Sequence, residues 1–202
     1  VELPLHEGSY KWSGGKSVSV FDSTIVGVET DTGLVGYGEV CPLGPFYLPA
    51  YAEGVRAGLR ELGPHLLGWN PCELAVLNQR MDAALKGHAY VKSGIDIACW
   101  DIVGKAAGLP LYRLFGGYRD AVPAYVTCGY YREGKDLSEL REEMHMLLDQ
   151  GHTGFKAKAG GLPVPEDVER MAVMREVIGN DRDFMIDPNR AWDLPTAIDA
   201  AH

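Results

Sequence analysis

The chain has 202 residues, of which 46% are hydrophobic and 23% are charged, a composition that suits one large globular domain or two small ones. Its net charge of -9 argues against nucleic acid or an anionic membrane surface as a partner, because both attract basic proteins. No apolar run approaches the roughly 18 residues of a membrane-spanning helix.

The first predicted element is a β-hairpin between residues 18 and 40. Its two runs are rich in β-branched residues and glycine, and Asp31-Thr32-Gly33 supplies the turn. A polar, glycine-rich loop is expected before it at 5–17. A second loop, rich in proline and aromatic residues, is expected after it at 41–49.

Three helices are predicted next. The first spans about 50–66, with leucine and valine on one stripe. The second begins after Asn70-Pro71, which reads as a cap followed by a first-turn proline. The third spans about 89–107 and is small and apolar nearly all round, so we expect it to be buried.

The pattern changes after residue 118, where strands begin to alternate with helices. Such alternation indicates βα units and a parallel sheet. The predicted strands and helices are, in order, strand 122–130, helix 136–150, strand 152–159, helix 165–178, strand 184–187 and a helix from 194 onward.

We therefore expect two domains, an α+β part at 1–118 and a β/α part at 119–202. The second part holds about two and a half βα units, whereas a closed eight-unit barrel takes roughly 250 residues. A three-stranded parallel sheet alone would leave apolar faces exposed. The favoured interpretation is an N-terminal fragment of a longer chain, and a small open sheet is the alternative.

Lys156 and Lys158 are the first candidates for chemistry. Residues two apart on a strand point the same way, so the two ammonium groups would lie about 6.6 Å apart along it. Mutual repulsion and desolvation would lower the pKa of an amine toward that of a working base. The alternative is a solvated edge strand, but Gly160-Gly161 indicates the carboxyl end of a barrel strand, where active sites lie.

Asp187 and Asn189 form the second candidate pair. They also follow a strand and would share a face, and a carboxylate at this end of a parallel strand suits a hard cation such as Mg²⁺. An N-cap or an Asx turn before the next helix is the alternative. Together the two pairs would place a metal ligand beside two ammonium groups, all facing a bound carboxylate.

Several aromatic residues gather in the two predicted N-terminal loops, where they either pack or form a lid or cation-binding cage over a ligand. They include Tyr10, Trp12, Phe46 and Tyr51. Gly14-Gly15-Lys16-Ser17 is not a phosphate loop, because Tyr10 stands where that motif needs glycine. The cysteines form no Cys-x-x-Cys pair, so we expect buried free thiols in a cytoplasmic protein. They are Cys41, Cys72, Cys99 and Cys128.

Four separated motifs in order resemble the mandelate racemase and muconate-lactonising branch of the enolase superfamily. The first is the strand ending Gly36-Tyr37-Gly38-Glu39, and the second is the run from Ser93 to Lys105, continued by Gly116-Gly117. The others are the Lys-x-Lys and Asp-x-Asn pairs. The resemblance spans essentially the whole chain. It implies a capping domain at 1–118 and the first two and a half units of a TIM-type (β/α)₈ barrel at 119–202.

The resemblance also implies roles for the site residues. Lys158 would be the base on one face of the substrate α-carbon, and Lys156 would stabilise the carboxylate and lower the pKa of Lys158. Asp187 would be the first ligand of Mg²⁺, with Mn²⁺ as the alternative, and Asn189 would orient the substrate or Lys158. The 202-residue chain alone is expected to be inactive, because two further metal ligands and an opposite-face acid or base are not present in it.

The loops around Tyr10–Lys16 and Cys41–Pro45 resemble the branch that acts on proline derivatives, which includes hydroxyproline-betaine epimerases and cis-3-hydroxyproline dehydratases. The aromatic residues Tyr10, Trp12, Phe46 and Tyr51 would then bind the substrate. A dipeptide epimerase, a muconate-type cycloisomerase and, with less support, a sugar-acid dehydratase remain open, as does a non-catalytic carboxylate-binding relative. The family implies a homo-oligomer, a dimer or an octamer, with a small-molecule carboxylate as its substrate.

Overall fold

The computed structural model describes residues 1–5 and 8–201, and part of the predicted 5–17 loop lies outside them. Contacts divide the chain into two units. The first contains residues 1–5 and 20–121, and the second contains the described residues of 6–19 and 122–202. No helix in this described part combines the length and apolarity needed to cross a membrane.

The first unit is built on an antiparallel hairpin, β5 (Thr24–Glu29) and β6 (Val35–Val40), which confirms the predicted hairpin. A second antiparallel pair joins β1 (Glu2–Pro4) to β4 (Val20–Asp22). β1 was not predicted, because a three-residue strand carries too few side chains to show a period. β4 lies within the range predicted for the hairpin, but it pairs with β1 instead.

Helices α1 (Ala52–Leu66) and α3 (Ala89–Ala107) agree with the prediction, and α3 ends at Gly108 in the left-handed conformation that glycine favours. Helix α2 (Leu74–Ala84) begins later than predicted, and Asn70 is not its cap. Asn70 accepts a hydrogen bond from the backbone N–H of Cys72 at 3.0 Å and so forms an Asx turn one turn before the helix. A short α4 (Leu111–Leu114) follows.

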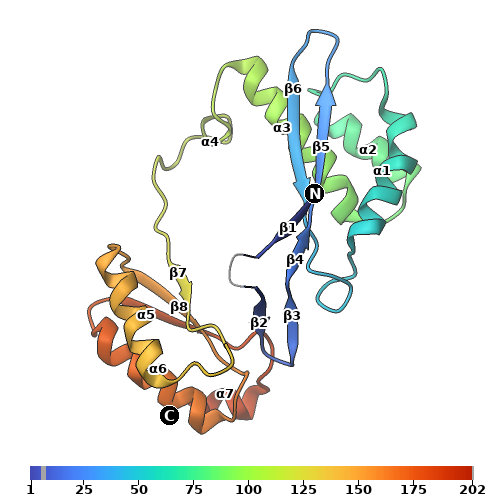
Figure 1. The fold of residues 1–202 in the computed structure, drawn as a ribbon. Coiled ribbons are helices and arrows are strands. Elements are labelled where there is room, and N and C mark those ends of the chain that lie inside the picture. Colours follow the sequence, from blue (N-terminus) through green and yellow to red (C-terminus); the bar gives the residue numbers. More distant parts are fainter. Residues whose placement is uncertain (6–7, 202) are drawn as a thin grey trace. The chain divides into compact units, whose positions relative to one another are not determined.

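Helix α3 lies along the hairpin because β6 carries glycine where the two backbones meet (Figure 1). A Cβ at Gly36 would stand 2.0 Å from the carbonyl oxygen of Ala98, and one at Gly38 would stand 2.0 Å from that of Gly94. An adjacent face of the helix packs on α1 and α2 in a core cluster formed by Leu62, Leu77, Met81, Val91, Ile95 and Cys99. Ile97 lies outside both contacts and is half exposed, so the helix is not buried all round as predicted.

Two polar residues of the Ser93–Lys105 run fasten this packing. Asp101 accepts a hydrogen bond from the backbone N–H of Tyr37 at 2.9 Å and pairs with Lys105 at 2.7 Å. Lys105 donates to the carbonyl of Val35 at 2.7 Å. In this structure the run therefore joins α3 to β6.

The second unit contains a parallel sheet in the order β7 (Val126–Cys128), β8 (Gly154–Lys158) and β9 (Asp183–Asp187), as predicted. The strand predicted at 122–130 is much shorter, and residues 121–125 form no strand. Helices α5 (Leu137–Asp149), α6 (Val164–Ile178) and α7 (Leu194–Ala201) alternate with these strands (Figure 1).

One face of this sheet packs on α5 and α6. Phe155 and Ala157 of β8 are fully buried there, as their alternation with the two lysines predicted. Their partners in the cluster are Cys128, Leu140, Met144, Leu147, Met171, Met174 and Ile178. The lysines of β8 consequently project from the opposite face.

The second unit also contains a hairpin that was predicted as a loop. β2 (Tyr10–Trp12) pairs antiparallel with β3 (Lys16–Val18), and Gly14 and Gly15 turn the chain with positive φ angles of 74° and 67°. The glycine-rich composition that suggested a loop is the composition a tight turn requires.

Candidate active site at the carboxyl edge of the parallel sheet

The candidate site lies where β8 and β9 end. The two strands pair in register, with Lys156 opposite Met185 and Lys158 opposite Asp187. The sheet continues for one residue, since the N–H of Ala159 donates to the carbonyl of Asp187 at 3.1 Å. This register brings the Lys-x-Lys and Asp-x-Asn pairs together at one edge.

Lys158 is the centre of the cluster. Its side chain is buried, with 4% of the residue exposed. The ammonium Nζ donates to Asp187 Oδ2 and to Asn189 Oδ1, both at 2.9 Å. Because β8 lies between β7 and β9 and Lys158 is buried, the alternative of a solvated edge strand does not hold.

Lys156 reaches the same carboxylate at a longer distance. Its Nζ stands 3.7 Å from Asp187 Oδ2 and donates to the hydroxyl of Tyr125 at 3.0 Å. The same ammonium lies 4.7 Å from the centroid of the Tyr125 ring. One carboxylate thus faces two ammonium groups, as the shared face of the strand predicted.

The charges alter the proton affinity of all three groups. Burial by itself would lower the pKa of Lys158, but the hydrogen bond and charge of Asp187, together with the interaction with Tyr10, outweigh it, so this pKa lies above its ordinary value. The pKa of Lys156 is raised chiefly by its hydrogen bond to Tyr125. For Asp187, burial opposes ionisation, yet Lys158 and the backbone N–H of Asn189 hold its pKa below the usual range.

The prediction that the lysine pair lowers the pKa of Lys158 is therefore wrong for the chain as it stands. Repulsion between the two ammonium groups is offset because the Asp187 carboxylate lies 2.9 Å from one and 3.7 Å from the other and compensates their charge.

Asn189 is held by an unusual backbone conformation. Its φ is +48° and that of Arg190 is +65°, and asparagine is among the few residues that tolerate this region. The Asn189 N–H donates to Asp187 Oδ1 at 3.0 Å, so the predicted Asx turn is present. The N-cap alternative is wrong, since Asp193 receives the backbone N–H of Thr196 at the start of α7.

Two of the predicted aromatic residues belong to this unit. The Tyr10 ring centroid lies 5.0 Å from that of Trp12 and 5.9 Å from Lys158 Nζ. The hairpin is tied to the loop after β9, because Ser13 Oγ donates to the carbonyl of Pro188 at 2.9 Å. Tyr10 therefore stands beside the cluster.

Phe46 and Tyr51 belong to the first unit, where each side chain is about half exposed. Their contribution to a substrate site stays a prediction.

The structure adds tyrosines that sequence reasoning missed. Tyr125 contacts Lys156, and the ring of Tyr130 lies 5.2 Å from that of Tyr10. Burial raises the pKa of Tyr130, so its hydroxyl stays protonated at neutral pH. Tyr130 follows β7 at the active edge, and the rule that sites form at carboxyl ends of strands would have found it. Tyr125 precedes β7 and carried no such signal.

The described residues supply part of a metal site. Asp187 offers a carboxylate and Asn189 an amide oxygen, the hard ligands that Mg²⁺ prefers, but Mg²⁺ requires about six oxygen ligands. No group of three or more His, Cys, Asp or Glu side chains suited to a metal ion occurs within residues 1–5 and 8–201. The donor chemistry fits, and the number of ligands does not.

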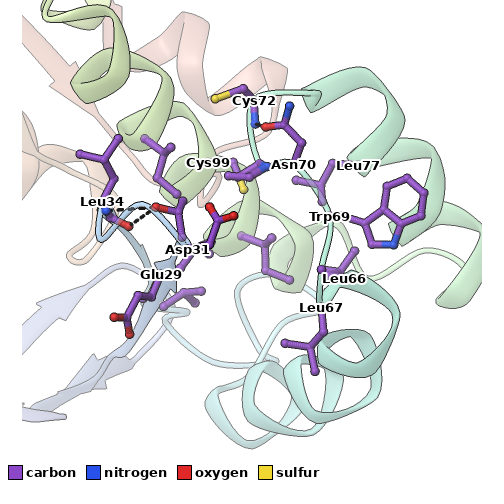
Figure 2. A pocket seen from close by; sticks show the side chains of 18 of the residues that line it. Glu29, Asp31, Leu34, Leu66, Leu67, Trp69, Asn70, Cys72, Leu77 and Cys99 are labelled. Atoms are coloured by element: carbon purple, nitrogen blue, oxygen red, sulfur yellow. Dashed lines mark hydrogen bonds between the residues drawn. The ribbon is translucent and has the colours of Figure 1, made fainter.

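The first unit holds a separate, largely apolar cavity of about 1270 Å³. It opens between the tip of the β5–β6 hairpin and the segment after α1, where Leu66, Leu67 and Trp69 are seen (Figure 2). At the margin of the cavity, Thr30 Oγ1 accepts a hydrogen bond from the Leu34 N–H and donates one to the Leu34 carbonyl. None of the lysine, aspartate or asparagine residues of the candidate site lines it.

All four cysteines are free. Cys99 and Cys128 are buried, and burial raises their pKa values to about 11 and about 12. Cys41 is half-buried and Cys72 is exposed, so the expectation of uniformly buried thiols is wrong for these two. Cys72 became exposed because the Asn70 turn places it before α2 rather than inside it.

A parallel β/α sheet with a buried lysine and a carboxylate at its carboxyl edge has the arrangement of α/β folds whose sites lie at the carboxyl ends of their strands. Residues 15–116 match the mandelate racemase/muconate lactonizing enzyme N-terminal domain, and residues 139–202 match the enolase C-terminal domain-like family. The chain belongs to the mandelate racemase/muconate lactonizing enzyme family of the enolase superfamily.

Individual relatives agree with this assignment. The chain is 47% identical over 193 residues to a cis-3-hydroxy-L-proline dehydratase from Roseibium aggregatum, a match that covers 95% of this chain and 51% of that protein. A Roseovarius nubinhibens enolase-superfamily structure complexed with magnesium matches with a TM-score of 0.84 and 37% identity, over 99% of this chain and 53% of the other.

A dipeptide epimerase from Enterococcus faecalis V583, solved with Mg and the dipeptide L-Leu-L-Tyr, matches with a TM-score of 0.88 and 30% identity, over 99% of this chain and 54% of the other. The chain thus spans about half the length of the relatives it matches. Magnesium is present in solved structures similar to the chain.

Proposed function

We propose that this chain carries the lysine-base part of an enzyme that removes the proton next to a substrate carboxylate. The observation that carries the proposal is the convergence of Lys156, Lys158, Asp187 and Asn189 at the carboxyl edge of β8 and β9, with Lys158 buried. A buried amine in a cluster of charged groups is the arrangement that acid–base catalysis uses.

The proton α to a carboxylate is weakly acidic, because its removal places a second negative charge on the same group. Lys158 would accept that proton at Nζ, a step that requires its neutral form, whereas Asp187 favours the ammonium in this chain. Lys156, as the ammonium, would lie beside the carboxylate and stabilise the charge that develops on it. Asn189 would keep Lys158 Nζ oriented through its amide oxygen.

Asp187 would be the residue of this chain that holds Mg²⁺, with Mn²⁺ as the alternative. The ion would supply positive charge to the enolate oxygens. Further ligands would have to join it, because the described residues provide one carboxylate at this place.

The substrate we propose is a proline derivative, such as 3-hydroxyproline or proline betaine, and the outcome is dehydration or epimerisation. Two observations support it: the 47% identity to a cis-3-hydroxy-L-proline dehydratase, and the ring of Tyr10 near Lys158, with the rings of Trp12 and Tyr130 packed against that of Tyr10. Aromatic faces attract a cationic ring nitrogen. Phe46 and Tyr51 are proposed to contribute from the first unit.

The test incubates the full-length protein in D₂O with Mg²⁺ and either cis-3-hydroxyproline or proline betaine, followed by NMR. Deuterium at C2 with an intact ring substituent means epimerisation, and loss of water means dehydration. Absence of exchange with both would overturn the proline-derivative substrate. Offering dipeptides and muconates next would separate the epimerase and cycloisomerase alternatives, the first of which is supported by the similarity to the Enterococcus faecalis enzyme.

We also propose that the protein is a cytoplasmic homo-oligomer, a dimer or an octamer, with a capping domain at 1–118 and a barrel domain from 119. Size-exclusion chromatography with light scattering would decide the oligomeric state.

A further inference from the structure

A polar cluster with two buried charged residues binds the loop that follows Lys158. Asp167, in the first turn of α6, is completely buried, and Arg170 one turn later is 6% exposed. The third member is Tyr131, which follows β7. None of these residues has a role in the proposed proton transfer, and buried charges are retained only where hydrogen bonds compensate them.

The cluster binds three consecutive backbone amides of the loop that follows Lys158. Asp167 Oδ2 accepts the N–H of Gly160 at 2.7 Å and that of Leu162 at 3.4 Å. Tyr131 Oη accepts the N–H of Gly161 at 3.0 Å and donates its own proton to Asp167 Oδ1 at 2.7 Å. The loop is therefore held along its length by one carboxylate and one phenol.

Arg170 extends the cluster to the neighbouring loop. Its Nη2 donates to the carbonyl of Gly129, directly after β7, at 2.6 Å. Its guanidinium carbon stands 4.5 Å from the Tyr131 ring centroid, and its Nε is 3.7 Å from Asp167 Oδ1. One face of α6 thus fastens the ends of β7 and β8 together.

The third loop of the edge is packed against the second. Gly160 has a φ of +80°, and a Cβ there would stand 2.7 Å from the Ala191 side chain and 2.9 Å from the Pro188 carbonyl oxygen. Pro188 and Ala191 flank Asn189, which holds Lys158 Nζ. A displacement of Gly160 would accordingly move the backbone next to both ends of the Lys158–Asn189 hydrogen bond.

We propose that Asp167, Tyr131 and Arg170 are positioning residues that set Lys158 against Asp187 and Asn189 by fixing the loop of residues 159–163. The inference rests on the proposed function for the role of Lys158, and the loop contacts stand independently of it. Small misplacements of a catalytic group are costly, since an error of about 1 Å can reduce a rate about 100-fold.

The test uses Tyr131→Phe, which removes the hydroxyl and keeps the ring over Arg170, and Asp167→Ala in the full-length protein. Both should reduce kcat for substrate α-proton exchange about 10- to 100-fold while KM changes less than about threefold. Hydrogen–deuterium exchange of the 159–163 loop amides should become at least about tenfold faster. Asp167→Asn, which keeps an oxygen for the Gly160 amide, should recover part of kcat.

Ile178→Val is the matched control, because it weakens the core at the far end of the same helix. It should lower thermal stability while kcat stays within about twofold and the loop stays protected. Unchanged kcat and unchanged loop exchange in Tyr131→Phe and Asp167→Ala would overturn the positioning role. If the wild-type protein exchanges no substrate proton, the proposed function fails, and loop exchange alone then decides the positioning role.

Discussion

Lys158 is the residue on which the proposed chemistry depends. It is buried, its Nζ is closer to Asp187 than that of Lys156, and it also donates to Asn189. Lys156 is more exposed and shares its ammonium between Asp187 and Tyr125. The two lysines, although two residues apart on one strand, therefore have different surroundings and different expected roles.

Lys158→Ala should abolish α-proton exchange, with a loss of at least about 100-fold in kcat, because the base is removed. Deuterium incorporation at the substrate α-carbon, followed by NMR, measures it. Lys86→Ala, at an exposed position of the first unit, is the control and should exchange at the wild-type rate. If the Lys158→Ala variant still exchanges the proton, Lys158 is not the base. If exchange is lost while the substrate dissociation constant stays unchanged, a purely substrate-binding role of the protein is excluded.

Asp187→Asn should lower the pKa of Lys158. Burial already disfavours the ammonium, and the hydrogen bond to Asp187 is the largest contribution that raises this pKa, so its removal leaves only Tyr10 to offset burial. NMR titration of ¹³C-labelled lysine side chains would follow the change. Asp183→Asn, at the exposed start of the same strand, should leave the titration of Lys158 where it is. A Lys158 pKa that stays raised in Asp187→Asn would contradict the assignment of Asp187 as its main partner.

At the scale of elements, close backbone approach explains how α3 and β6 pack. The glycines of β6 and Gly94 of α3 leave room that no other residue would leave, and Asp101 and Lys105 then bind the strand backbone. Gly36 and Gly38 belong to one of the motifs that indicated the family, and this close contact with α3 explains why glycine is needed at both positions.

Gly38→Ala should destabilise the first unit by about 1–3 kcal/mol, because the added methyl would collide with the backbone of α3 rather than with a movable side chain. Urea denaturation monitored by circular dichroism measures the change. Gly63→Ala is the matched control: no atom lies within 4 Å of its added Cβ, and alanine in a helix should raise stability by about 0.5–1 kcal/mol. Equal effects of the two substitutions would refute the close-approach argument.

At the scale of the molecule, the candidate site draws its ligands and bases from the second unit, through the β2–β3 hairpin and the ends of β7, β8 and β9. The described residues provide too few oxygen ligands for a complete Mg²⁺ site. One carboxylate paired with two ammonium groups is a poor Mg²⁺ site, since the cation must displace both.

The 202-residue chain by itself should bind Mg²⁺ weakly and show no turnover. Isothermal titration calorimetry with MgCl₂ and the deuterium-exchange assay would check both expectations, and the full-length protein assayed in parallel is the positive control. Mg²⁺-dependent exchange by the isolated chain would refute the prediction.

The amino-acid sequence by itself determined the hairpin, the three long helices and the βα alternation, because period and turn residues report local structure directly. It also placed Lys156, Lys158, Asp187 and Asn189 at strand ends, since two residues apart on a strand share a face. The short strands β1 to β3 were not predicted, nor was the pairing of β4 with β1. The true start of α2 was also missed, because Asn70 forms an Asx turn instead of a helix cap.

Only the tertiary structure decided how those four residues interact. The register of β8 on β9 sets Lys158 opposite Asp187, and this carboxylate reverses the expected direction of the Lys158 pKa. Tyr125 and the Asp167–Arg170–Tyr131 cluster are brought to the site by contacts between residues far apart in sequence, such as Tyr131 to Asp167 and Lys156 to Tyr125. Tyr130 is brought there by its contact with the more distant Tyr10. Local sequence patterns do not predict such partners, because the burial of a side chain and the charges around it depend on which elements meet in space.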